Sequence, residues 1–486
     1  MNLNELILGL SQAEKRYFTR LSSFQKLGKT NYMKLFLSYK RDRQEKGVKK
    51  DLNENYSAQL KQQLKNKVLE SLRYFHKKSI PYNSENQLIQ NAFVLKSRGY
   101  WTEAKKVLQK VKIKSNDHGS FIHSYSDLAF IQSRLSKNGI EQMLENWDCE
   151  VNAQLKSQEV ILQMDKKYLE ISLLNKEIES ARKPIHKKLL TTYISNLESF
   201  KEVVSNSNYS LLYYNYNFGL SNYLLGNVEV SYDAMNTIYK LVNSNSYLLN
   251  LRKDLILRSM ANRVLCTIAI GDFYLAKSHL KDLESMQTPT TFYASYKKYL
   301  IYVLELMIFS KTGNFIGGVK AFDEYFIEKN DFISSVSVEA FICQEDIYET
   351  FYYANCLYKS GFKRKAIRIM FEFVSLMKNT DKKDAYSAAR FFYLVLLIEL
   401  NDDELIYAEL RSIERFLKEQ KLFFSVEKIL LQFVKKLMTK NTSFNIRSHY
   451  NALINDLEKL KKDPFERNAF TYFDFLDWAK GKLESF

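Results

Sequence analysis

Proline and glycine are scarce in this sequence. Only 4 prolines and 14 glycines occur among its 486 residues, which is far below the average usage of both. A sheet-rich fold needs these residues in its many tight turns, so their scarcity argues against it and favours long helices. The chain is longer than one compact core supports, so we expect several domains or an open-ended array of repeats.

Cysteine is also rare, and no apolar run is long enough to cross a membrane. Cys149, Cys266, Cys343 and Cys356 form no CxxC pair and have no histidine at metal-ligand spacing, which predicts buried thiols. The longest apolar run, FFYLVLLI, covers only residues 391–398, and the first residues carry acidic side chains where a secretory signal needs an apolar core. We therefore predict a cytoplasmic protein that has no membrane partner.

Motifs that bind phosphate or carry out catalysis are missing as well. The sequence contains no GxxxxGK[ST], GxGxxG, GxSxG or HExxH motif. Carboxylates gather in NDDEL (401–405) and QED (344–346), where capping and the helix dipole favour acidic residues at a helix start. We expect no catalytic residue, no cofactor and no bound metal ion, and predict that the protein is not an enzyme.

Positive charge is concentrated in the first part of the chain. Residues 1–110 hold 23 basic and 9 acidic residues, a net charge of +14, whereas the whole chain carries +17. Such asymmetry suggests an anionic partner for the basic part. Lysine, asparagine, isoleucine, tyrosine and phenylalanine are abundant throughout, however, and codon bias in an AT-rich genome is a second explanation for the excess of lysine.

A pattern that starts at a glycine recurs along the chain. In KSRGYWTEAKKVLQKV, Gly99 is followed by Trp101, Ala104, Leu108 and Val111 at offsets of 2, 5, 9 and 12 residues. The clear copies begin at Gly99, Gly226, Gly271, Gly313 and Gly361. Each has a small residue at the second offset and apolar residues at the third and fourth, and a weaker copy begins at Asn401. The long gap from Gly99 to Gly226 leaves room for three degenerate units, of which Gly139 fits poorly as a start.

This pattern is the one that a helical hairpin requires. A glycine adopts the left-handed conformation that ends one helix, so that the next helix begins immediately. A small residue at the second offset lets the two helices lie close together, and all four positions share one helix face. Each hairpin keeps apolar surface on both sides, which only stacked neighbours bury, so the sequence predicts an all-α solenoid.

The same residues resemble tetratricopeptide repeats (TPR). The Gly-x-aromatic-x-x-Ala signature is similar to the second half of that motif, and Gly219 lies where its first helix often carries a small residue. The spacing here is longer than that of TPR units, and the motif's opening Trp-Leu-Gly and closing proline are mostly absent. The resemblance implies a TPR-like solenoid with lengthened helices, and it covers residues 86–420.

Both ends of the chain differ from the repeats. LSQAEKRYFTRL contains a capping box, Ser11 with Glu14, and begins a small basic helical bundle over residues 1–80. Residues 421–486 are expected to form C-terminal capping helices, the last of them from DPFERNAF onward, with Phe470, Phe473 and Trp478 covering the open end of the solenoid. The motifs LSQAEKRYF and YFDFLDW together resemble a family of TPR-like proteins from Bacteroidota, which has no established activity, so this resemblance implies a fold only.

Two sets of residues are candidates for binding. Tyr213, Tyr214 and Tyr216 cannot all face one core, because consecutive helical residues lie about 100° apart, so some are expected to line a concave surface that binds a peptide. In SAQLKQQLKNKVLESLRYFHKK, an apolar stripe leaves four basic residues toward solvent as a candidate contact for a polyanion: Lys61, Lys65, Arg73 and Lys77.

These features support two functional hypotheses. The favoured one is a non-enzymatic scaffold or adaptor that binds a protein or peptide partner in the groove of a helical-repeat array. The alternative is a nucleic-acid-associated or regulatory protein that contacts a polyanion through residues 1–80, although the sequence shows no assignable helix-turn-helix.

Overall fold

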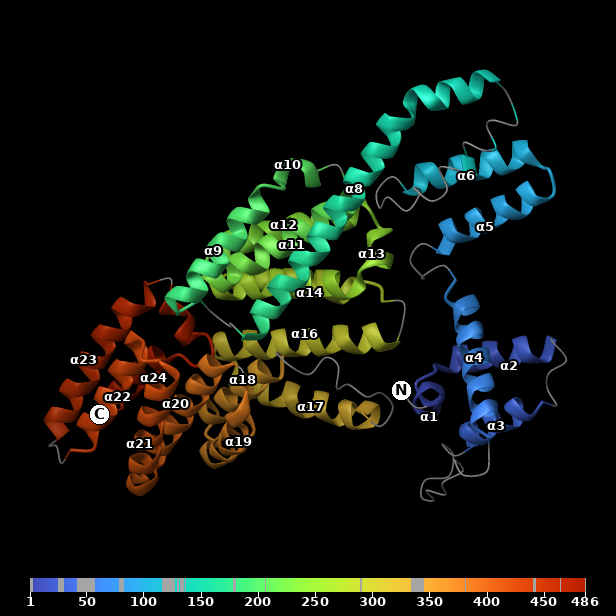
Figure 1. Cartoon of the computed structure of the whole chain (residues 1–486). Helices are drawn as coiled ribbons and strands as arrows, with labels where there is room; N and C mark the ends of the chain where they lie inside the picture. The colour runs from blue at the N-terminus through green and yellow to red at the C-terminus, as the bar shows by residue number, and fades with distance from the viewer. Residues whose placement is uncertain are drawn as a thin grey trace.

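The structure is a computed structural model in which every regular element of the described residues is a helix (Figure 1), as the sequence predicts. The described residues are 3–24, 30–41, 57–77, 83–115, 127–128, 131, 135, 137–177, 181–205, 207–288, 291–333, 345–380, 382–439, 443–463 and 465–485.

The first four helices form a small bundle with a core of its own. They are α1 (Leu3–Leu8), α2 (Gln12–Phe24), α3 (Asn31–Arg41) and α4 (Ala58–Phe75). Leu35, Phe36 and Leu64 lie at the centre of this core and have no exposed surface. The predicted capping box is confirmed, because Glu14 N donates to Ser11 Oγ over 3.2 Å and Ser11 N donates to Glu14 Oε2 over 2.6 Å.

After the bundle, the described residues form one hairpin, one long helix and two shorter helices. The elements are α5 (Asn83–Ser97), α6 (Trp101–Ser115), α8 (Lys137–Glu177), α9 (Pro184–Glu198) and α10 (Lys201–Val204). The gap before Gly226 is long enough for three degenerate hairpins, but a single helix of 41 residues, α8, runs uninterrupted through about a third of it. Gly139 lies in the first turn of α8 and starts no hairpin.

Five hairpins follow and stack side by side. They comprise α11 (Asn208–Leu225), α12 (Val228–Ser244), α13 (Leu248–Leu251), α14 (Lys253–Ile270), α15 (Phe273–Ser285), α16 (Thr291–Lys311), α17 (Phe315–Ile333), α18 (Glu345–Lys359), α19 (Lys363–Leu376), η2 (Met377–Asn379), α20 (Lys383–Leu400) and α21 (Asp403–Gln420). The first helix of each hairpin is the inner one, and the second is the outer one. The inner helices are α11, α14, α16, α18 and α20. The predicted solenoid of helical hairpins is therefore confirmed.

The turns lie where the glycine pattern predicts them. Gly99, Gly226, Gly271, Gly313 and Gly361 have φ angles of 82°, 88°, 93°, 80° and 87°. Asn401, the start of the weaker copy, also has a left-handed φ, of 56°. At Gly271 the amide donates to Thr267 O and Ile268 O over 3.1 Å, so the left-handed residue satisfies two carbonyls that the end of α14 leaves free.

Small residues lie at the helix crossings, as the pattern predicts. Ala104, Ala276 and Ala366 have no exposed surface. A methyl group at Gly318 would lie 2.5 Å from Cys356 Sγ, so α17 and α18 approach too closely there for any larger residue. Gly219 has the same role between α11 and α12, because a methyl group there would lie 2.7 Å from Met235 Cε.

Inner and outer helices of the solenoid differ in how much of their surface is buried. Of 18 residues in inner helix α20, 12 are buried, whereas outer helix α21 also has 18 and buries only 4. Outer helices therefore have one apolar stripe and one solvated face. Inner helices are apolar on nearly all sides, so the concave side of the stack must also be covered.

The last helices return across the stack. They are α22 (Ser425–Leu437), α23 (Ser443–Lys461), η3 (Arg467–Phe470) and α24 (Phe475–Glu484). The expectation of one helix from DPFERNAF onward was wrong, because residues 465–474 form turns and a 3₁₀ helix, and only α24 is α-helical. Aromatic side chains that pack on different inner helices hold this stretch in a non-helical path. Phe470, Phe473 and Trp478 are buried, as predicted.

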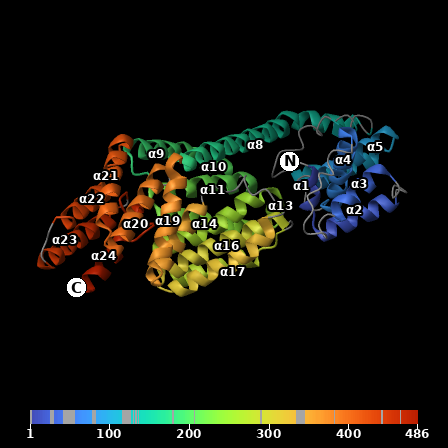
Figure 2. The same ribbon diagram turned by 90° about the horizontal axis from the view of Figure 1, so that it is seen from below.

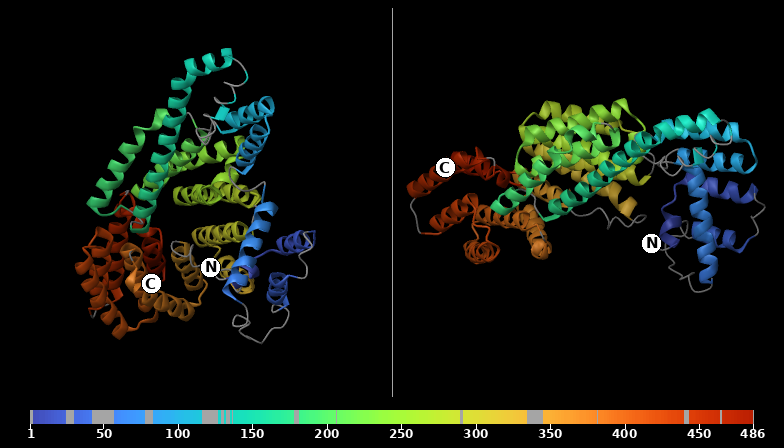
Figure 3. Two further views of the ribbon diagram at one scale, coloured as in Figure 1. Left: turned by 45° about the vertical axis from the view of Figure 1, so that its right-hand side comes forward. Right: turned by 45° about the horizontal axis from the view of Figure 1, so that its top comes forward.

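Buried apolar residues of the described chain form three clusters. One lies in α1–α4, one in and around the α5–α6 hairpin, and the largest extends from Ile161 to Ala479. Figure 2 shows α1–α4 at one end of the molecule and α21–α24 at the other, with α8 running along the repeats. The right-hand view in Figure 3 likewise shows the blue helices α1–α4 set apart from the repeats. The division of the chain into a bundle (1–80), repeats (86–420) and C-terminal capping helices (421–486) stays a prediction.

The length and hydropathy of the helices show whether any of them could cross a membrane. Among the residues that the structure describes, no helix combines the length and the apolar character that a bilayer crossing requires.

Replacing Ala276 by leucine should lower the free energy of unfolding by about 1–3 kcal/mol through overpacking of the α14–α15 crossing. Urea denaturation followed by circular dichroism measures the change. The control is Tyr274→Leu on the same helix, where the side chain is 88% exposed, and this variant should keep the midpoint of the parent. An unchanged midpoint for Ala276→Leu would contradict the crossing geometry.

Candidate binding cavity on the concave face

A short stretch of non-helical chain covers the concave side of the inner helices. We call residues 465–474, between α23 and α24, the C-terminal segment. Along its length it contacts elements from both ends of the repeat array. Lys187 of α9 lies 3.9 Å from the ring centre of Phe465, and Arg467 donates to the carbonyl oxygen of Gly226. The segment thus reaches the first hairpin of the stack.

Its second half lies against the last inner helices. Tyr352 Oη of α18 donates to the carbonyl oxygen of Thr471 over 2.7 Å. The ring of Tyr472 lies 5.4 Å from that of Tyr348, and Phe473 stacks on Phe392 of α20 with 4.2 Å between ring centres. The segment is therefore held by aromatic contacts and by a hydrogen bond to its main chain at Thr471.

A buried ion-pair cluster joins the two ends of the array. We call Arg182, Glu427 and Glu466 the clasp. Arg182 Nη2 lies 2.7 Å from an oxygen of each carboxylate, and its guanidinium lies 4.3 Å from the ring centre of Phe424. The side chains of Arg182, Glu427 and Glu466 are only 5%, 7% and 12% exposed. Burial alone would lower the pKa of Arg182, but the two carboxylates raise it.

A cavity of about 430 Å³ remains beside the C-terminal segment. Its walls come from the C-terminal ends of α14 and α16, from α18, and from the segment itself. They combine apolar and aromatic side chains, such as Leu265, Met307 and Tyr352, with polar groups of the segment, Asn468 and Thr471. A smaller cavity of about 110 Å³ adjoins it, and Tyr223 and Met307 line both.

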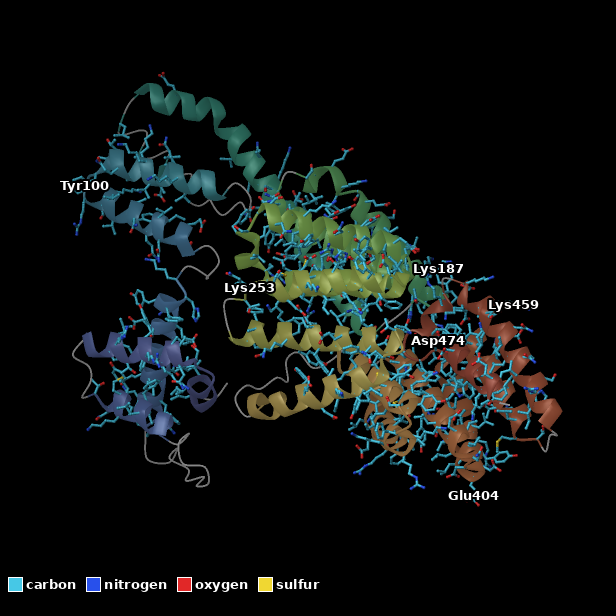
Figure 4. The ribbon with its side chains drawn as sticks, turned by 180° about the vertical axis from the view of Figure 1, so that it is seen from behind. Tyr100, Lys187, Lys253, Glu404, Lys459 and Asp474 are labelled. Carbon is cyan, nitrogen blue, oxygen red and sulfur yellow. The ribbon has the colours of Figure 1, made fainter. Side chains whose placement is uncertain are left out.

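Three cations and one carboxylate line the larger cavity: Lys311, Lys461, Arg467 and Asp474. Figure 4 labels Asp474 at the junction of the C-terminal helices and the repeats. This carboxylate already accepts a hydrogen bond from Lys461 Nζ over 2.7 Å and from the amides of Leu476 and Asp477. Burial raises the pKa of Asp474, but the hydrogen bond and charge of Lys461, the charge of Lys311 and the Asp477 amide together lower it below its usual value.

The remaining positive charge has little compensation. Lys311, in the last turn of α16, forms no hydrogen bond or ion pair with any residue that the structure describes. Burial lowers the pKa of Lys311, and the nearby carboxylate of Asp474 only partly offsets that effect. Arg467 uses one donor for Gly226 O, and its other side-chain N–H groups have no partner among the described residues.

The tyrosines that the sequence singled out lie on inner helix α11 and are all buried. Tyr213 has no exposed surface and receives a hydrogen bond from Tyr209 over 3.1 Å, and Tyr214 stacks on Phe218. Only Tyr216 lines one of the two cavities, the smaller one. A role for these three residues in binding a partner stays a prediction, and the geometry gives Tyr216 the most direct access to a ligand.

Three of the four basic candidates lie on α4 of the N-terminal bundle, and Lys77 lies in the turn that follows this helix. Arg73 and Lys77 are exposed, whereas Lys61 and Lys65 are half-buried beside the apolar stripe of the helix. The stripe packs inward, since Leu64 and Val68 are buried. Nearby, His76 Nε2 lies 2.5 Å from Glu14 Oε1, which connects the end of α4 to the capping box of α2. A polyanion contact on this helix stays a prediction.

The clasp and the cavity cations were missed at the level of the sequence. Arg182 is separated from Glu427 by 245 residues and from Glu466 by 284, so no local pattern connects them. Lys311 follows the apolar run YLIYVLELMIFS and ends a helix, where a lysine is expected for its favourable interaction with the helix dipole. Nothing in its spacing indicates that it faces a cavity.

Comparisons with known proteins give distant structural likeness only. No protein family and no curated protein matches this sequence at a significant level. Among solved structures, the chain is similar to that of NprR in complex with its cognate peptide NprX, with 14% sequence identity and a TM-score of 0.40. The likeness covers 75% of this chain and 98% of the NprR chain. At this distance the likeness carries no inference about function.

Metal-ligating residues are dispersed within the part of the chain that the structure describes. No group of three or more histidine, cysteine, aspartate or glutamate side chains lies there in an arrangement that could hold a metal ion. Cys266 and Cys356 are buried free thiols, as expected, and burial raises the pKa of each to about 12. His118, His123 and Cys343 lie outside the described residues.

Replacing Arg182 by alanine should destabilise the protein by about 3–5 kcal/mol, because it leaves two buried carboxylates without their partner. Urea denaturation measures this loss. A triple variant that also carries Glu427→Gln and Glu466→Gln removes the uncompensated charges and should recover part of the stability. A loss below about 1 kcal/mol for Arg182→Ala would mean that the clasp is no more than a surface ion pair.

Changing Lys65, Arg73 and Lys77 together to glutamate should abolish any binding of nucleic acid by the full chain at low salt. Polyanion affinity depends on the number of phosphates that basic side chains neutralise, and it falls steeply as salt rises. Gel-shift titrations measure the effect, with Lys277→Glu and Lys281→Glu on outer helix α15 as the control. Equal binding by the triple variant and the parent would exclude this face.

Proposed function

We propose that the chain is a non-enzymatic protein-interaction scaffold whose concave cavity binds an acidic segment of a partner protein. The observation that carries this proposal is the positive charge of Lys311 and Arg467 in a cavity of about 430 Å³, where the carboxylate of Asp474 only partly compensates Lys311. A charge held out of water is unfavourable unless it is paired, so a ligand carboxylate that reaches Lys311 would gain a strong, charge-assisted interaction.

The C-terminal segment supports a peptide as the ligand. It already lies along the concave face and uses a contact that any extended peptide offers, namely a main-chain carbonyl, that of Thr471, which accepts a hydrogen bond from Tyr352. Rings on two inner helices, such as Tyr348 of α18 and Phe392 of α20, complete the contact through its aromatic side chains. The cavity continues this surface, so a partner segment can lie next to residues 467–474 and use the same aromatic wall.

Charge supports an acidic ligand over a basic one. Three of the four charged groups that line the cavity are cations, and the one carboxylate, that of Asp474, is already bound by Lys461 and by two backbone amides. The carbonyls at the C-terminal ends of α14 and α16 account for part of the attraction that holds these cations, but none accepts a hydrogen bond from Lys311.

Two further parts of the proposal concern the cellular location and the family of the protein. Free thiols at Cys266 and Cys356 support the proposal of a cytoplasmic location, where cysteines stay reduced. Membership of the TPR-like family from Bacteroidota remains a proposal that rests on the motifs near the two ends of the chain.

Fluorescence anisotropy with labelled peptides tests the function. A library of acidic peptides is titrated with the full chain, beside peptides of the same length in which each acidic residue is replaced by lysine. Acidic peptides should bind more tightly, and Lys311→Met should weaken the best of them by about tenfold or more, since a hydrogen bond to a charged group contributes about 1.5–3 kcal/mol.

The matched control is Lys320→Met, an exposed lysine on outer helix α17, which should leave the affinity unchanged. Lys311→Met should also raise the urea midpoint, because an apolar side chain replaces a half-buried charge that has no ion-pair partner among the described residues. Reduced peptide affinity in a more stable protein separates loss of the site from loss of the fold. Equal affinity for acidic and basic peptides would contradict the proposal.

A further inference from the structure

A row of leucines faces solvent along the middle of α8. The side chains of Leu155, Leu162, Leu169 and Leu173 are 50%, 64%, 67% and 60% exposed. The opposite face of the same helix packs on the repeats through Ile161, Met164 and Ile171, which are buried. Single exposed leucines are common, but a continuous row of them marks an interaction surface.

The row has the spacing of a coiled-coil seam. The solvent-facing positions are Leu155, Glu159, Leu162, Lys166, Leu169 and Leu173, separated alternately by four and three residues. Two helices that repeat this 4–3 spacing wind around each other and interlock these side chains along a common seam. The row runs from Leu155 to Leu173, 18 residue steps along the helix, which is about 27 Å at a rise of about 1.5 Å per residue.

Apolar surface continues from α8 onto the neighbouring helix. Ile185 and Leu189 of α9 are 64% and 48% exposed. They line a cavity of about 580 Å³ between α8 and α9, together with Leu173 and Leu174. A helix lying on the α8 row would therefore also cover this patch, which enlarges the area that association removes from water.

We infer that α8 is a self-association surface, on which the α8 helix of a second copy packs in the antiparallel direction. Charge complementarity within the row identifies the occupant. In a parallel pair, Glu159 would face Glu159 of the second copy, and Lys166 would face Lys166, so both charged layers would repel. Repulsion in these two layers therefore excludes the parallel pair.

An antiparallel pair places the same residues in complementary positions. When Leu155 lies opposite Leu173 of the second copy, Glu159 and Lys166 fall in adjacent layers on opposite helices, and two-fold symmetry forms the ion pair twice. Glu159 and Lys166 have no ion-pair partner among the described residues of their own chain. A sequence that is self-complementary in this way fits a second copy of itself.

The test is the mass of the full chain in solution, measured by sedimentation and by light scattering over a wide range of concentrations. The parent should approach twice 57.4 kDa as its concentration rises. Leu162→Glu combined with Leu169→Glu should give a monomer at every concentration. The control is Ile316→Glu on α17, an equally exposed apolar residue (64%) away from α8, which should still dimerise.

Charge exchange tests the direction of the pairing. Glu159→Lys alone and Lys166→Glu alone should each weaken the dimer, and the double exchange should restore it, because the antiparallel ion pairs re-form with their signs reversed. A double variant no stronger than either single variant would overturn the antiparallel arrangement. A parent chain that stays monomeric at all concentrations would overturn the proposal, and the α8 row would then belong to a different partner.

Discussion

The inner helices α11, α14, α16, α18 and α20 are apolar on almost every side, and the rest of the structure follows from the need to cover both of their faces. Outer helices cover the convex side, and the small residues at Ala276, Gly318 and Ala366 allow the close approach that this requires. On the concave side the covering is irregular. Helices α8 and α9 lie over the first hairpin, and the C-terminal segment lies across the remainder.

This irregular covering is what creates a candidate site in an otherwise packed core. Residues 465–474 are fixed at one end by the clasp and at the other by aromatic stacking on α18 and α20. Between these anchors the chain does not fill the space beside α14 and α16, and the cations that line it keep unused hydrogen-bond donors. Recognition and stability are thus coupled, since the residues that close the solenoid also form one wall of the cavity.

Local spacing in the sequence was enough to predict the hairpins, because a left-handed glycine and a small residue five positions later are requirements of adjacent helices. The capping box at Ser11 and Glu14 was predictable for the same reason. Features that depend on residues far away in the sequence were not predictable from local spacing. The path of residues 465–474 is determined by Arg182, Tyr352 and Phe392, and the buried positions of Tyr213 and Tyr214 depend on α8 and α9, which the repeat pattern does not cover.

Amide hydrogen exchange of the full chain with and without the best acidic peptide tests the central claim most directly, because it maps binding without any substitution. The account predicts slower exchange in the C-terminal segment and in the last turns of α14 and α16, at Ile268 to Ile270 and Ile308 to Lys311, the region that borders the cavity. The exchange of α4 should not change. Protection confined to residues 57–77 of the basic N-terminal bundle, with none at the cavity, would contradict it.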